Sequence, residues 1–171
     1  TVVSVMAVNN EVGTVTDLAA VASIVRDVAP GVVVHTDAVQ APTWVDLRPI
    51  TSVVDLLSLS AHKFGGPKGV GVLVVREGSP YRPLLVGGGQ ERERRSGTQN
   101  VAGVVAMAAA LELTDVERAA ETSRLAALRD RVQPPVARIE VGPRDPGGEH
   151  RQRFVEAFDQ ADETDLRFDG F

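Results

Sequence analysis

The hydrophobic pattern of the first third of the chain predicts two strands joined by one amphipathic helix. Residues 1–8 are mostly apolar or β-branched, as is typical of a buried strand, and residues 32–34 repeat this composition. Between them, apolar residues recur at helical spacing after Asp17 and stop before Pro30: Leu18, Val21, Val25 and Val28. A strand, a helix and a strand with short connections indicate a βαβ unit and a parallel sheet.

Two further strands and a long helix are predicted in the middle of the chain. Residues 53–60 have the apolar, partly β-branched content of a buried strand, and residues 69–76 resemble them. Residues 80–86 are expected to add an extended piece. Apolar positions at helical spacing then predict a helix over residues 101–132, with a break near residues 114–115 and an exposed, charged second half.

The composition changes after this helix. Four of the five phenylalanines lie in residues 154–171, among many charged side chains and after a stretch rich in proline and glycine. No continuation completes a layer for these aromatic residues. We therefore interpret residues 1–132 as a partial α/β domain with its exit helix, and residues 133–171 as a divergent tail.

Composition excludes several classes of function. The 171 residues carry a net charge of −5 with both signs mixed, which disfavours nucleic-acid and membrane-surface binding. There is neither an apolar run of transmembrane length nor a signal-peptide pattern, so a cytoplasmic location is expected. The chain contains no cysteine, and its three histidines lack ligand spacing, so no metal site is expected.

The strongest chemical signal is Lys63, in the segment Ser60-Ala61-His62-Lys63-Phe64-Gly65-Gly66-Pro67-Lys68-Gly69. This lysine follows a predicted strand, and ligands of open α/β sheets bind beyond the carboxyl ends of the strands. A partly desolvated lysine there can form a Schiff base with pyridoxal phosphate. The alternative is a solvated surface lysine in a glycine-rich loop.

A carboxylate is predicted at the same edge of the sheet. Residues 35–40, His-Thr-Asp-Ala-Val-Gln, follow a strand, so Asp37 should lie near Lys63. Asp37 could pair with a protonated pyridine nitrogen, because opposite charges favour the ionised forms of both groups. Gln40 would then face the phenolic oxygen of the cofactor. Alternatively, Asp37 caps a helix and Gln40 lies on the surface.

Four further side chains could complete such a site. Asn10 follows the first strand and could bind the phenolic oxygen or a substrate, or simply form a turn. Ser60 and His62 flank the lysine with donors suited to phosphate, although Ser60 could cap a turn. Thr98 precedes a helix, where a hydroxyl and free amides favour an anion, with a plain helix cap as the alternative.

Together these segments resemble one family. Residues 8–14, 35–40, 60–69 and 87–100 resemble four motifs of the cysteine desulfurases, in the same order. These are pyridoxal-phosphate enzymes of the class V aminotransferase group, and the resemblance covers residues 1–132. It implies the large domain of a fold-type I enzyme, a three-layer αβα structure with a mainly parallel sheet, here incomplete.

The resemblance also implies roles for individual residues. Lys63 would be the catalytic residue that holds the cofactor, Asp37 would contact the pyridine nitrogen, and Thr98 would reach the phosphate in the partner subunit of a homodimer. The implied cofactor-binding residues are Asn10, Asp37, Gln40, Ser60, His62, Lys63 and Thr98.

The implied reaction converts L-cysteine to alanine, with Lys63 as general base and acid. A separate enzyme cysteine would take the sulfur as a persulfide and pass it to an acceptor protein for iron-sulfur assembly or tRNA thiolation. This chain has no cysteine and lacks the family's upstream phosphate loop and stacking histidine. We therefore expect it, in isolation, to bind the cofactor weakly or not at all and to release no sulfide.

Three interpretations account for the difference between this sequence and the family pattern. The favoured one is a fragment of a normal desulfurase with a divergent or frame-shifted tail. A second is a cysteine-independent relative, such as a class V aminotransferase, lyase or desulfinase. The third is a non-catalytic remnant that keeps the fold and a dimer surface.

Overall fold

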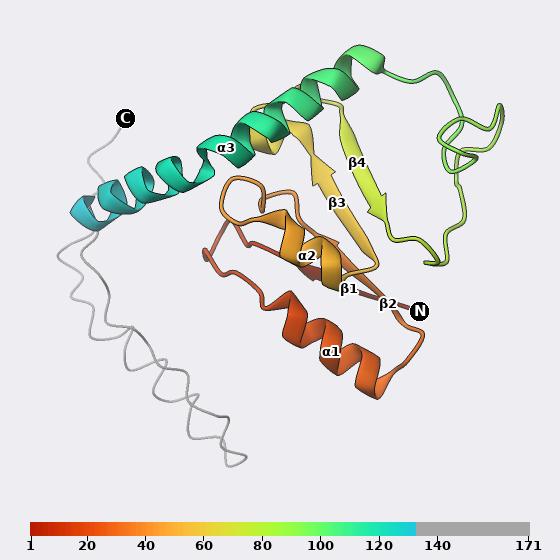
Figure 1. The fold of residues 1–171 in the computed structure, drawn as a ribbon, viewed down its shortest axis with the longest axis horizontal. Helices are drawn as coiled ribbons and strands as arrows, with labels where there is room; N and C mark the ends of the chain where they lie inside the picture. Colours follow the sequence, from red (N-terminus) through yellow and green to blue (C-terminus); the bar gives the residue numbers. More distant parts are fainter. Residues whose placement is uncertain (133–171) are drawn as a thin grey trace. The chain divides into compact units, whose positions relative to one another are not determined.

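A four-stranded mixed sheet lies at the centre of the computed structural model, which describes residues 1–132 (Figure 1). The strand order is β1-β2-β3-β4; β1 and β2 pair parallel, as do β2 and β3, whereas β4 runs antiparallel to β3. The strands are β1 (Val2–Met6), β2 (Val33–Asp37), β3 (Leu56–Ser60) and β4 (Gly71–Val75). The interpretation of residues 133–171 as a tail concerns residues outside the described range.

The first helix and the parallel register confirm the predicted βαβ unit. Helix α1 (Leu18–Val28) begins after Asp17, whose side chain accepts a hydrogen bond from the amide of Ala20 at 3.0 Å. The β1–β2 register pairs Met6 with Asp37, the last residue of both strands. The carboxyl ends of the parallel strands therefore share one edge of the sheet.

The predicted strand over residues 53–60 is partly wrong, because its start belongs to a helix. Helix α2 (Leu47–Val53) follows Asp46, whose carboxylate accepts a hydrogen bond from the amide of Arg48 at 2.9 Å. The hydrogen bond from the Arg48 side chain, and then that from its amide, lower the pKa of Asp46. This capping bond favours a helix over residues 47–53, although the apolar pattern predicts no element before residue 53. Because Val53 ends that helix, β3 begins only at Leu56.

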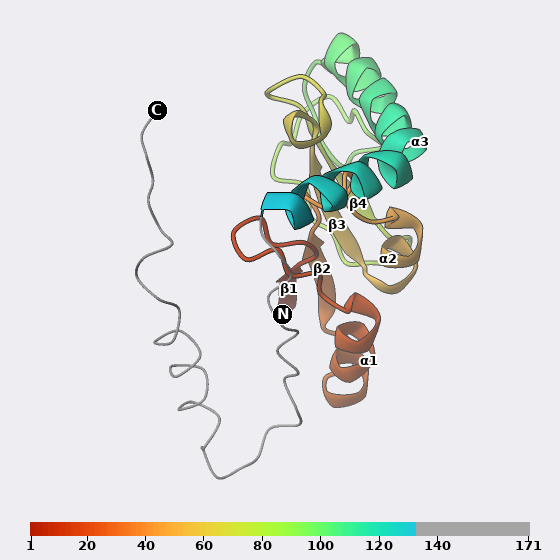
Figure 2. The same cartoon turned by 90° about the vertical axis from the view of Figure 1, so that its left-hand side faces the viewer.

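The long helix α3 (Val101–Val132) is continuous, so the predicted break at residues 114–115 is wrong. Figure 2 shows that the helix changes direction part-way along instead. Thr114 Oγ1 donates to the carbonyl of Ala110 at 2.8 Å, and such bonds to the preceding turn bend helices without ending them. Residues 80–86 form no strand either, because Pro80 and Pro83, at the start and in the middle of that stretch, remove ladder donors.

The hydrophobic core lies between the sheet and its three helices. Figure 2 shows α1, α2 and the first half of α3 on one side of the sheet. The buried side chains on this side include Leu18, Ala22, Val34, Leu57 and Met107. The predicted α/β class with a mostly parallel sheet is confirmed, and the described residues contain the sheet and one helical layer.

The opposite face of the sheet carries a row of polar side chains. His35 on β2 lies between Ser4 on β1 and Ser58 on β3, with ring nitrogens 2.7 Å and 3.3 Å from the two hydroxyl oxygens. The row therefore links three strands. Among residues 1–132, no helix combines the length and apolarity needed to cross a bilayer.

Candidate active site

Lys63 lies in a short 3-10 turn, η1 (Ala61–Phe64), that directly follows β3. The turn is anchored by its buried residues, since Ala61 and Phe64 are 0% and 6% exposed. Gly65 ends it in the left-handed region with a φ of 85°, and the amide of Gly66 donates to the carbonyl of Ala61 at 2.8 Å. Lys63 itself is exposed, so the anchored turn carries its side chain into solvent.

Asp37 is the last residue of β2, at the edge from which the Lys63 turn leaves β3. Asp37 pairs in register with Ser58, and the next amide, that of Ala38, donates to the Ser58 carbonyl at 3.0 Å. One carboxylate oxygen, Oδ1, accepts the amide of Val39 at 3.0 Å. The prediction that Asp37 and Lys63 share one edge is confirmed, and the helix-cap alternative for Asp37 is wrong because α2 begins only at Leu47.

Ser60 and His62 flank the lysine and contact each other. The Ser60 hydroxyl lies 2.9 Å from Nδ1 of His62. The end of β3 and the turn η1 therefore hold these two polar side chains together beside Lys63. Within residues 1–132, no three histidine or carboxylate side chains come together as metal ligands.

The turn after β1 depends on Asn9 rather than Asn10. Asn9 Oδ1 accepts the amides of Glu11 and Val12 at 2.9 Å and 3.0 Å. Asn10 is exposed and, within the described residues, forms no side-chain hydrogen bond. Gln40 is half-buried three residues after Asp37. The structure therefore leaves both amides available near the sheet edge without joining them to Lys63.

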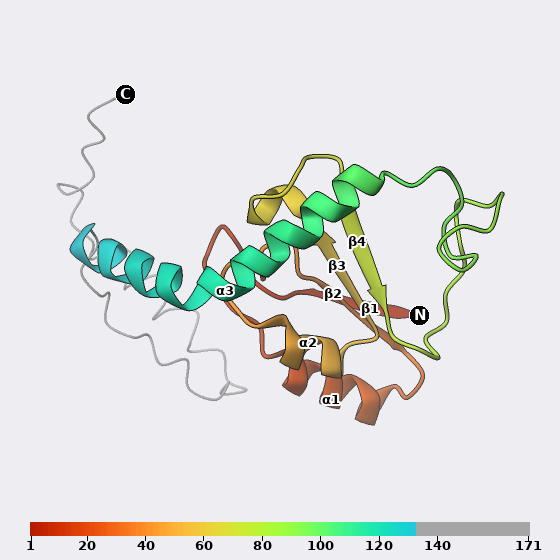
Figure 3. The ribbon, with the colours of Figure 1, turned by 45° about the horizontal axis from the view of Figure 1, so that its top comes forward.

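Thr98 lies in an exposed loop and does not cap α3. Asn100 caps the helix instead, because its Oδ1 accepts the amide of Gly103 at 3.0 Å. The loop is held internally, for example by the bond from the Gly97 amide to Gln90 Oε1 at 3.0 Å. Figures 1 and 3 show the loop before α3 apart from η1, so this chain does not bring Thr98 to Lys63.

A pair of alanine variants tests this assignment of the cap. Asn100→Ala should destabilise the chain by about 0.5–2 kcal/mol, because the Gly103 amide loses its acceptor. Thr98→Ala should leave the stability within about 0.5 kcal/mol, as expected for an exposed loop residue. Urea unfolding of both variants measures the difference. Equal losses of stability, or a larger loss for Thr98→Ala, would show that Thr98 contributes to the cap of α3.

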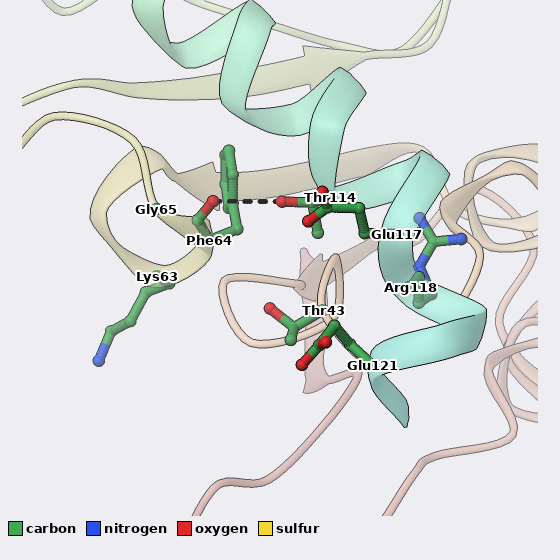
Figure 4. Close-up of a pocket in the computed structure, with 8 residues that line it drawn as sticks. All are labelled: Thr43, Lys63, Phe64, Gly65, Thr114, Glu117, Arg118 and Glu121. Atoms are coloured by element: carbon green, nitrogen blue, oxygen red, sulfur yellow. Dashed lines mark hydrogen bonds between the residues drawn. The ribbon is translucent and has the colours of Figure 1, made fainter. Parts of the chain in front are cut away.

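A pocket of 290 Å³ lies between the lysine turn and α3 (Figure 4). A hydrogen bond from Arg124 lowers the pKa of Glu121, one of the carboxyl groups in its wall. In Figure 4 the Lys63 side chain points away from the helix. None of the α3 residues that line this pocket was predicted from the sequence. The lining residues are Thr43, Lys63, Phe64, Gly65, Thr114, Glu117, Arg118 and Glu121.

Comparison with known proteins identifies the family. The model of the class V aminotransferase family matches residues 1–144. This chain belongs to the class V aminotransferase family. Its curated relatives include a cysteine desulfurase of Bradyrhizobium diazoefficiens, 46% identical over 80% of this chain, and cysteine desulfurase IscS of Dictyoglomus turgidum, 44% identical over 75%. Class V aminotransferases and cysteine desulfurases depend on pyridoxal phosphate.

Solved structures confirm the fold. A NifS-like protein superposes with a TM-score of 0.73 at 46% identity, covering 77% of this chain and 36% of that protein. DndA of Streptomyces lividans superposes with a TM-score of 0.68 at 37% identity, covering 77% and 38%. The two curated desulfurases are covered over 34% and 32% of their lengths, so this class V chain spans about a third of them.

Proposed function

We propose that this chain supplies the lysine and the ring-nitrogen partner of the pyridoxal phosphate site of a cysteine desulfurase. The observation that carries the proposal is the placement of Asp37 and Lys63 at the ends of neighbouring parallel strands. Relatives named cysteine desulfurases, at 44% and 46% identity, support this choice of reaction within the family.

The residues present fit the cofactor chemically. Oδ1 of Asp37 accepts a hydrogen bond from the Val39 amide. Within residues 1–132 its Oδ2 forms no hydrogen bond, so this oxygen can face a pyridine nitrogen. Ser60 and His62 offer a hydroxyl and an imidazole to a phosphate group. Asn10 and Gln40 supply amides for the phenolic oxygen. The exposed amine of Lys63 completes the set.

Each of these residues would have a distinct task. Bound pyridoxal phosphate supplies an electron sink that stabilises negative charge at the substrate Cα. Asp37 keeps the ring nitrogen protonated through its opposite charge. Lys63 Nζ would take the proton from Cα of L-cysteine and, once the Cβ–S bond has broken and the sulfur has passed to an accepting thiol, return a proton to give alanine. Because the sequence contains no cysteine, the thiol that accepts the sulfur comes from outside these residues.

The complete enzyme would be a homodimer that passes sulfur to an acceptor protein. The loop that carries Thr98 is exposed and lies apart from the Lys63 turn in Figures 1 and 3. A second copy would be needed to bring such a loop to a bound phosphate. The acceptor would use the sulfur for iron-sulfur assembly or tRNA thiolation, as the resemblance to cysteine desulfurases implies.

Replacing Asp37 with asparagine tests the proposed cofactor contact. Asp37→Asn keeps the shape of the side chain but removes the charge opposite the ring nitrogen, so pyridoxal phosphate should bind about tenfold more weakly. Quenching of the single tryptophan, Trp44, measures the binding. Asp27→Asn, at an exposed carboxylate on α1, is the matched control. Equal affinity of Asp37→Asn and the unchanged chain would contradict the proposal.

A further inference from the structure

Two side chains on α3, one helical turn apart, reach backbone carbonyls outside the helix, and Thr114 shares its one hydroxyl proton between such a carbonyl and that of Ala110. Thr114 Oγ1 lies 3.2 Å from the carbonyl oxygen of Phe64, fifty positions earlier in the chain. Arg118 Nε donates to the carbonyl oxygen of Pro42 at 2.8 Å. The two donors therefore tie one face of the helix to two separate loops.

Each acceptor belongs to a loop that carries a proposed cofactor contact. Phe64 immediately follows Lys63 and is the buried last residue of the turn η1. Pro42 is fully buried and follows Gln40 by two positions, in the segment that continues from Asp37. Figure 4 shows the hydrogen bond between Thr114 on α3 and Phe64, with Arg118 on the same helix.

The two donors are themselves held in place. Arg118 is only 12% exposed in its side chain, and it also pairs with Asp115, which Arg48 contacts at 3.5 Å. Thr114 has one hydroxyl proton and two carbonyl oxygens within reach, those of Phe64 and Ala110. The hydroxyl thus links the lysine turn to the bend of the helix.

We propose that Thr114 and Arg118 are positioning residues that fix the distance between Lys63 and Asp37. This inference rests on the proposed function, because that distance matters only if both residues contact one ligand. The aldehyde carbon of pyridoxal phosphate is bonded directly to the rigid ring that contains the nitrogen, so the distance between the two protein groups that contact them must match this fixed spacing. Loops that drift by a fraction of an ångström lose this match.

Matched variants on the same helix separate this role from general helix stability. Thr114→Val removes the hydroxyl with little change of shape, and Thr122→Val does the same at a threonine that bonds only within the helix, to the Arg118 carbonyl at 2.6 Å. Arg118→Met removes the second donor. Its control is Arg124→Met, at an arginine that pairs with Glu121 on the same helix.

Hydrogen exchange measured by mass spectrometry gives the first readout. Thr114→Val should speed exchange in residues 61–66 by about fivefold, because the lysine turn loses one net hydrogen bond. Arg118→Met should do the same in residues 38–45. Thr122→Val and Arg124→Met should change neither segment, and Thr114→Ser should restore protection. Loop exchange that is unchanged by Thr114→Val and Arg118→Met, or equally faster in the controls, overturns the inference.

Covalent trapping gives the second readout on the full chain. After incubation with pyridoxal phosphate and reduction with borohydride, Thr114→Val and Arg118→Met should label Lys63 several-fold less than the unchanged chain, while Thr114→Ser labels it normally. If both variants label Lys63 fully, the positioning role is wrong even where exchange changes. If the unchanged chain itself shows no preference for Lys63, the proposed function fails instead, and hydrogen exchange alone still decides whether α3 fixes the two loops.

Discussion

Replacing Lys63 with alanine should abolish the phosphopyridoxyl label that borohydride fixes on the folded chain. The chain has two lysines, Lys63 and Lys68, and both are exposed in the same glycine-rich segment. Lys63 lies in the turn η1 that directly follows β3, at the edge where Asp37 ends β2, whereas Lys68 lies further along the connection to β4. Trapping captures even short-lived attachment, so the test holds for the weak binding expected of this chain. Mass spectrometry of the digested protein locates the label.

Lys68→Ala is the matched control for this variant. It removes an amine of the same chemistry and exposure five residues away, and it should leave the label on Lys63 unchanged. A label that survives Lys63→Ala at full level, or that disappears with Lys68→Ala, would show that the chain offers no specific lysine. Either result would contradict the proposed cofactor site.

Replacing Gly66 with alanine should displace the lysine turn. A Cβ at Gly66 would lie 2.8 Å from the Cβ of Ala61 and 3.0 Å from its carbonyl oxygen. Ala61 is fully buried and cannot move aside without disturbing the core. Overpacking of this kind costs about 1–3 kcal/mol of stability, and it would shift the backbone that carries Lys63. Labelling of Lys63 should fall together with the stability.

Gly69→Ala separates this steric effect from backbone strain. Gly69 has a φ of 76° with open space around a Cβ, so its replacement costs about 1–2 kcal/mol through the left-handed conformation alone. We expect Gly69→Ala to lose stability but to keep the labelling of Lys63. Urea unfolding and trapping should be measured on both variants. Full labelling of a folded Gly66→Ala chain would show that the close packing of the turn is unimportant for the site.

Local patterns predicted the parts of the fold that depend on local physics. The helix after Asp17 and the parallel order of the first strands follow from apolar spacing, a capping side chain and short connections. Parallel order then placed Asp37 and Lys63 at one edge without any knowledge of their contacts. Each of these steps uses residues that are close in sequence or a rule that holds for parallel sheets generally.

The features that sequence reasoning missed depend on contacts between distant residues or on a choice between neighbouring caps. Nothing near Thr114 or Arg118 marks them as donors to Phe64 and Pro42, which lie 50 and 76 positions away. The cap of α3 could be Thr98 or Asn100 by composition, and only geometry selects Asn100. Asn9 and Asn10 present the same ambiguity.

The most direct test of the account compares labelling of the two lysines in the folded chain and in urea. The chain is incubated with pyridoxal phosphate, reduced and digested, and the label on Lys63 is divided by that on Lys68. If the fold builds a cofactor site around Lys63, the ratio is well above one in buffer and falls to about one in urea, where both amines are equivalent. A ratio that is the same in both conditions would contradict the central claim that this fold presents Lys63 to pyridoxal phosphate.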